Sequence, residues 1–127
     1  MKTSDTEKIT INLGPADLGR LDLLVDQGIY SSRSDAIRTG VRNLFEKHQD
    51  VIDDVKKRTS AVLGVLVLGK SDLEKALSSG KKLSLNIIGM LVLKEDVTPE
   101  LASRAIESVR VHGAFRAPEA VKKALLG

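Results

Sequence analysis

"KITINLG", residues 8–14, is the stretch of the sequence that decides the fold of the N-terminal half. In a strand, successive side chains point to opposite faces. The alternation here places apolar side chains on one face and polar side chains on the other: Ile9, Ile11 and Leu13 against Lys8, Thr10 and Asn12. An isolated strand leaves backbone donors and acceptors unpaired. Because no complementary strand pattern follows before residue 60, we expect the partner strand to come from elsewhere.

Two amphipathic helices follow the strand. Gly14-Pro15 ends the extended pattern, and proline suits the first turn of a helix because its missing N–H needs no partner there. Leucines at helical spacing continue to Gly28, a suitable C-terminal cap. Ser32 precedes Asp35 by three residues, which resembles a capping box and predicts a second helix from about Arg33.

The unit formed by residues 8–47 is too small to bury its own apolar faces. Domains below about 40 residues usually need oligomerisation or another device to stay folded. A second copy would cover these apolar faces. It would also pair the strand, because two antiparallel copies of residues 8–13 would complete each other's backbone hydrogen bonds. We therefore predict a homodimer whose two strands form one intersubunit ribbon above four helices.

The order of strand, Gly-Pro break, helix, "GIYSSRSDAIR" (residues 28–38) and helix resembles the ribbon-helix-helix family of bacterial DNA-binding proteins, the Arc, MetJ and CopG class. The resemblance covers residues 7–48. It implies that the ribbon lies in the major groove of double-stranded DNA. The family's outward strand positions fall on Lys8, Thr10 and Asn12, which would contact base edges. Its phosphate contacts fall on the start of the second helix, at Ser32, Arg33 and Ser34.

The amino-acid composition argues against a membrane protein and permits DNA binding. The longest apolar run, at residues 61–68, is far shorter than the roughly 20 residues that span a bilayer, and the N-terminus lacks the apolar core of a signal peptide. We expect a cytoplasmic protein with no membrane contact. The net charge of +3 permits DNA binding, although residues 1–47 hold seven basic and seven acidic residues. Because these charges balance, the affinity for DNA must depend on where the basic residues lie in the folded unit.

The C-terminal half contains an internal repeat. Three segments align on Gly64, Gly89 and Gly113, which are 25 and 24 residues apart. Each has a strand-like apolar run and then a short helical stretch, the second of which extends to Ile106. Runs such as Val65–Leu68 are typical of parallel strands that are covered on both faces. The arrangement resembles a short leucine-rich-repeat-like solenoid, whose open ends could join subunits.

These patterns predict an α+β protein in three parts. Residues 1–48 form the ribbon-helix-helix domain, residues 49–60 a connector or helix extension, and residues 61–127 a repeat domain for higher-order oligomerisation or partner binding. The function we expect is a sequence-specific transcriptional regulator that acts as a repressor.

Other functions remain open. An antitoxin that binds a toxin and regulates its own operon is one alternative, and its partner-binding tail would be unfolded when free. A DNA-associated scaffold or filament protein is another. A transition-metal sensor would need several His and Cys ligands, whereas the chain has only His48 and His112 and no cysteine. We predict no cofactor, no metal site and no catalytic residues, because no phosphate loop or nucleophile–base spacing is present.

Overall fold

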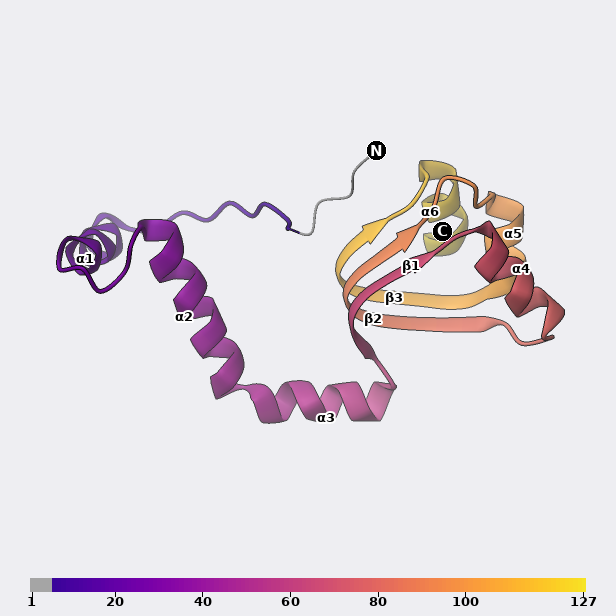
Figure 1. The fold of residues 1–127 in the computed structure, drawn as a ribbon, viewed down its shortest axis with the longest axis horizontal. Coiled ribbons are helices and arrows are strands. Elements are labelled where there is room, and N and C mark those ends of the chain that lie inside the picture. Colours follow the sequence, from indigo (N-terminus) through magenta and orange to yellow (C-terminus); the bar gives the residue numbers. More distant parts are fainter. Residues whose placement is uncertain (1–5) are drawn as a thin grey trace. The chain divides into compact units, whose positions relative to one another are not determined.

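A computed structural model describes residues 6–127 of the protein. The chain divides into two compact units, the first ending at Ile52 and the second spanning Asp53–Gly127. The described residues form six helices and one three-stranded sheet, in agreement with an α+β protein (Figure 1). The division between the units falls inside the segment that the sequence predicts as a connector. That segment is a helix of its own, α3 (Gln49–Thr59).

The N-terminal unit is built on α1 (Pro15–Asp26) and α2 (Arg33–Lys47), close to the predicted bounds. A Schellman turn ends α1. Gly28 has a φ of 76°, its N–H donates to the carbonyl of Val25, and the N–H of Ile29 donates to the carbonyl of Leu24. Gly28 is therefore the C-terminal cap that the sequence predicts, and it turns the chain from α1 towards α2.

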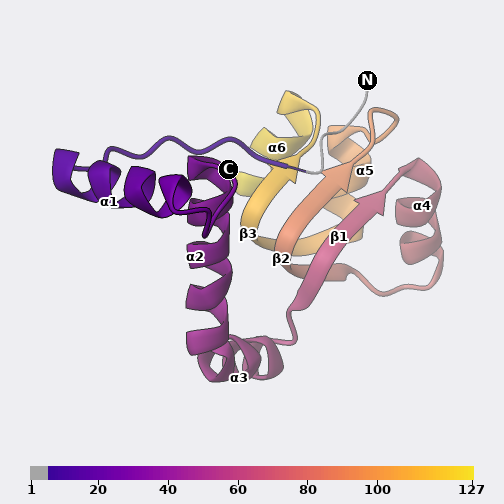
Figure 2. The same cartoon turned by 60° about the vertical axis from the view of Figure 1, so that its left-hand side comes forward.

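The C-terminal unit repeats a strand and a helix three times. The strands β1 (Val62–Leu68), β2 (Leu83–Leu93) and β3 (Ile106–Arg116) pair in parallel in that order (Figure 2). They are followed by α4 (Lys70–Ser78), α5 (Pro99–Ala105) and α6 (Glu119–Leu126). Parallel strands need such crossover connections because the chain must return to the same end of the sheet.

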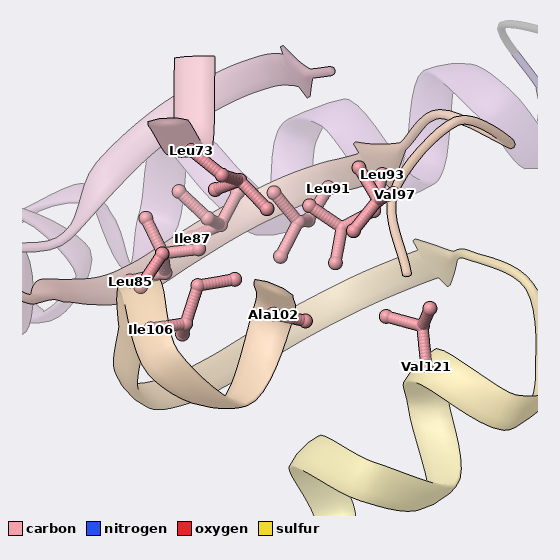
Figure 3. Close-up of a cluster of buried hydrophobic side chains, with 10 residues drawn as sticks. Leu73, Leu85, Ile87, Leu91, Leu93, Val97, Ala102, Ile106 and Val121 are labelled. Carbon is pink, nitrogen blue, oxygen red and sulfur yellow. The ribbon is translucent and has the colours of Figure 1, made fainter. Parts of the chain in front are cut away.

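The main hydrophobic core lies between the strands and these three helices (Figure 3). Leu73 from α4, Ala102 from α5 and Val121 from α6 are fully buried there against Ile87 and Leu91 from β2. Full burial of a large aliphatic side chain stabilises a fold by about 1.5–3 kcal/mol. The helix that follows each strand therefore supplies the cover for one face of the sheet.

The three glycines that align in the sequence are neighbours in the sheet. Gly64 pairs with Gly89, and Gly89 pairs with Gly113. All three have positive φ angles, between 125° and 138°, which side chains other than glycine rarely adopt. A Cβ on Gly89 would collide with the carbonyl oxygen of Gly64, and one on Gly113 with that of Gly89. The glycine row thus lets the backbones of adjacent strands approach each other closely.

The repeats are also linked through the start of α4. Asp72 accepts a hydrogen bond from the N–H of Gly69 at 2.8 Å, as in a capping box. Asp96, from the loop after β2, accepts one from the N–H of Lys70 at 3.1 Å. Its contact with α4 depends on the stacking of two repeats, which no local pattern reveals.

Three details differ from the sequence-based expectations. Residues 8–13 form no strand in the single chain, because the sheet of the described residues consists of β1, β2 and β3 alone. Ile106 begins β3 instead of extending the preceding helix, which ends at Ala105. The prediction that β1 is covered on both faces is wrong for the single chain, because Val65 and Val67 are 61% and 47% exposed.

Candidate nucleic-acid interface

The segment before α1 exposes both of its faces. Lys8, Thr10 and Asn12, which the sequence predicts as base-contacting residues, are all exposed. The apolar residues between them are exposed too: Ile9 by 81%, Ile11 by 56% and Leu13 by 41%. An apolar face of this kind is unfavourable in water until another surface covers it. The segment therefore exposes its polar side chains, and its apolar side chains have no cover among the described residues.

The two helices of the N-terminal unit leave a second apolar surface open. Within the described part of this unit, Ala36 is the one buried hydrophobic residue. The apolar side chains of α2 are 38–53% exposed: Ile37, Val41, Leu44 and Phe45. Helix α2 therefore carries an amphipathic stripe with nothing packed over it. So little buried surface is unfavourable for the stability of a small unit on its own.

The N-terminus of α2 holds the predicted phosphate contacts. The Ser32 side chain accepts a hydrogen bond from the N–H of Asp35 at 3.0 Å, which confirms the predicted serine cap. The Asp35 carboxylate accepts hydrogen bonds from the N–H and the hydroxyl of Ser31, at 3.0 and 3.2 Å. The cap is therefore a variant in which the acidic side chain reaches one residue further back than in a standard capping box.

This cap leaves the first backbone donors of the helix open. Among residues 6–127, the N–H groups of Arg33 and Ser34 have no hydrogen-bond acceptor, and both residues are exposed. Free N–H groups and the positive end of the helix dipole attract anions. The geometry at the start of α2 therefore suits a phosphate oxygen, although Asp35 is close to it.

Arg33 also has a role that sequence reasoning missed. Its Nε and Nη2 atoms donate to the two carboxylate oxygens of Asp22 on α1, at 2.7 and 2.9 Å. This bidentate pair ties the start of α2 to the middle of α1. Arginine has five N–H groups, so the remaining ones are still available to a ligand. Asp22 and Arg33 are eleven residues apart, and only the packing of the two helices brings them together.

The ion pair makes the N-terminal unit sensitive to acid. The hydrogen bonds from Arg33, assisted by its charge, lower the pKa of Asp22 below its ordinary value. A carboxyl group whose pKa is lower in the folded state than in the unfolded chain stabilises the fold at pH values above its unfolded-state pKa. This stabilisation is lost as the pH falls through the folded-state pKa. We expect thermal unfolding of the parent protein to lose this contribution below about pH 4.

Asp22→Asn removes the titrating group but keeps the size of the side chain. The variant should therefore show a flatter pH dependence of Tm between pH 5 and pH 2, measured by circular dichroism. Asp17→Asn is the matched control, because Asp17 lies on the same helix and its ion pair with Arg20, at 3.6 Å, is exposed. Identical pH profiles for the parent and Asp22→Asn would contradict the role given to this pair.

The profile of the ribbon-helix-helix transcriptional regulator family matches residues 4–122. The chain belongs to the ribbon-helix-helix transcriptional regulator family. It is also 36% identical over 50 residues to an uncharacterized protein of Archaeoglobus fulgidus, a match that covers 39% of this chain and 83% of the relative. No solved structure matches the chain.

Family membership gives the chain its general function, that of a DNA-binding regulator of transcription. The ribbon-helix-helix match extends far beyond the N-terminal unit and takes in all three strands of the sheet. Sequence reasoning placed the resemblance only at residues 7–48, where the motifs are most specific. The repeat unit is therefore part of what the family profile describes.

Other kinds of site have little support in the described residues. His48 ends α2 and His112 lies exposed on β3. Within residues 6–127, no three His, Cys, Asp or Glu side chains are grouped so that they could hold a metal ion. In the same part of the chain, no helix has the length and apolar character needed to cross a membrane.

Proposed function

We propose that two copies of the chain pair through residues 8–13 as an antiparallel ribbon and place it in the major groove of an operator. The observation that carries the proposal is the exposed apolar face of Ile9, Ile11 and Leu13 in a member of this family. Antiparallel pairing would satisfy the backbone hydrogen bonds of both segments and bury their apolar faces over the open stripe of α2.

In this dimer, the polar side chains of the ribbon read the bases. Lys8 donates to guanine O6 or N7, Asn12 pairs with adenine, and Thr10 offers a hydroxyl and a methyl group. The exposure of all three side chains in the single chain supports these roles. The start of α2, with Ser32, Arg33 and Ser34, then contacts the DNA backbone and fixes the ribbon in the groove.

We further propose that the protein acts as a repressor without a catalytic step, and that its C-terminal unit mediates oligomerisation. Linked dimers would combine several weak DNA contacts, which offsets the balanced charge of the N-terminal unit. The packed core of residues 61–127 supports this role over that of an antitoxin tail, which would fold only on its toxin.

The two kinds of contact should respond differently to substitution. Asn12→Ala should reduce the preference for the operator over unrelated DNA by about 1–3 kcal/mol, because it removes a base contact. Ser34→Glu should weaken binding to every sequence and reduce the salt slope by about 1, because it places a negative charge against a phosphate. Glutamate near a helix N-terminus stabilises the helix, so weaker binding would not reflect unfolding.

Fluorescence anisotropy at several salt concentrations measures both effects, with the upstream DNA of the gene and a scrambled duplex as ligands. Ser103→Glu, at an exposed site on α5, is the matched control and should bind like the parent. An equal loss on both duplexes for Asn12→Ala, or a loss on the operator alone for Ser34→Glu, would refute the assigned roles. Failure of the parent protein to prefer any operator would refute the proposed function as a whole.

A further inference from the structure

Strand β1 is an edge strand without the usual protection of an edge. It pairs with β2 on one side, and no strand of the described residues pairs with its other side. Proteins normally protect a free edge with charged side chains, proline or a bulge, because an open edge binds other strands. The seven residues of β1, Val62–Leu68, contain no charged residue and no proline.

The side chains of β1 that point away from the helices are also open. Leu66 and Leu68 pack against the core, whereas Val65 and Val67, which alternate with them, are 61% and 47% exposed. Leu63 lies on the same face as these valines and is 58% exposed. Contiguous exposed apolar surface of this kind marks an interaction site in a soluble protein.

The exposed apolar surface lies on β1 and diminishes on β2. In the sheet register, Leu63, Val65 and Val67 lie beside apolar residues of β2 that are less exposed: Met90 is buried, and Ile88 and Val92 are half-buried. The corresponding residues of β3 are His112, Ala114 and Arg116. The apolar patch is therefore centred on the β1 side of the sheet. The β3 edge, in contrast, exposes Glu107, Ser108 and Arg110 and so has the protection that β1 lacks.

We propose that β1 of one chain docks against β1 of a second copy, around a twofold axis, and that this contact is the oligomerisation surface of the C-terminal unit. The inference rests on the oligomerising role proposed above and names its residues. A second β1 is the occupant because it presents an apolar surface that matches the patch, whereas β3 would bring Glu107 and Arg110 against it. A twofold contact also closes on itself, while addition of β1 to β3 would continue without end.

The backbone at Gly64 is consistent with this contact. A Cβ on Gly64 would meet nothing within 4 Å, although its φ of 138° equals that of Gly89, whose Cβ would collide with the adjacent strand. The outer side of β1 at Gly64 is therefore open to the approach of another backbone.

Disulfide cross-linking of the full chain tests the inference directly, because the sequence contains no cysteine. Antiparallel strands place opposite Cα atoms about 4.5–5.5 Å apart, within the range that a disulfide spans. Leu63→Cys, Val65→Cys and Val67→Cys would be oxidised singly and in equimolar mixtures, so that every register is covered. We expect a covalent dimer from at least one of these samples and none from Ser108→Cys, the control on the exposed β3 edge.

Light scattering provides a second measurement that does not depend on oxidation. The full chain carrying Ile11→Asp, which disrupts the proposed ribbon, should remain a dimer through β1. Addition of Val65→Lys should halve its mass, whereas addition of Ser108→Lys should leave the mass unchanged. Circular dichroism of each variant would verify that the C-terminal unit is folded.

Three results would overturn the inference. The first is the absence of any β1 cross-link together with an unchanged mass for Val65→Lys. The second is a disulfide between Val65→Cys and Ser108→Cys of different chains, which would indicate head-to-tail addition. The third is a disulfide between Ile9→Cys and Val65→Cys within one chain, which would mean that residues 8–13 cover β1. Cross-linking at β1 without operator binding would instead refute the proposed function and leave this contact in place.

Discussion

Ile11→Asp is expected to abolish operator binding. In the proposed dimer, Ile11 is the central apolar residue of the ribbon, and its side chain moves from 56% exposed in the single chain to the interior. An aspartate there would be buried without a partner, which costs far more than the loss of the isoleucine contacts. Without the ribbon, the base-contacting side chains of two chains can no longer meet in one groove.

The expected loss of operator affinity is about 10³-fold or more, since specific binding exceeds nonspecific binding by at least that factor. Fluorescence anisotropy with the operator duplex measures it. Leu126→Asp is the matched control, because Leu126 is an exposed apolar residue, at 60%, that lies outside the proposed DNA surface. Operator binding by Ile11→Asp at the level of Leu126→Asp would mean that the apolar face of residues 8–13 does not form the dimer.

Gly89→Ala is expected to destabilise the C-terminal unit by about 2–6 kcal/mol. Two effects add at this position. A side chain at a φ of 138° strains the backbone by about 1–3 kcal/mol. The new Cβ also collides with the carbonyl oxygen of Gly64, and overpacking of this kind costs typically about 1–3 kcal/mol. Because the obstacle is backbone, no side chain can move aside to relieve the contact.

Gly64→Ala separates these two effects. Gly64 has the same φ as Gly89, but an added Cβ there meets nothing within 4 Å. When both alanine variants also carry Val65→Lys, which disrupts the proposed β1 contact, this control should lose only the contribution from backbone strain, about 1–3 kcal/mol. Urea unfolding followed by circular dichroism measures both variants. Equal losses for the two alanine variants would show that the close approach of β1 and β2 contributes nothing to stability.

The features that the sequence predicted well are those with a local cause. Helices α1 and α2 begin where Pro15 and Ser32 indicate, because a proline in the first turn and a serine cap act on neighbouring backbone groups. The Schellman turn at Gly28 belongs to the same class, since only the chain around Leu24–Ile29 is involved.

The features that the sequence did not predict depend on residues distant in the chain. The Arg33–Asp22 pair forms only when α1 packs against α2, and the Asp96 contact with α4 forms only when two repeats stack. The boundary at Ile106 was misplaced because a short apolar run fits both a helix end and a strand start. The exposed face of β1 was missed because a continuous apolar run looks the same whether one or both of its faces are covered.

In the proposed dimer, the near-absence of a core in the N-terminal unit makes its folding dependent on how much protein is present. Ala36 is the one buried hydrophobic residue there among the described residues, so in that dimer most of the buried surface comes from the second copy. When folding and association are one event, dilution itself unfolds the chain. A freshly made chain would then stay open to proteases until it meets another. A low protein concentration would shorten the lifetime of such a regulator, and a high concentration would prolong it.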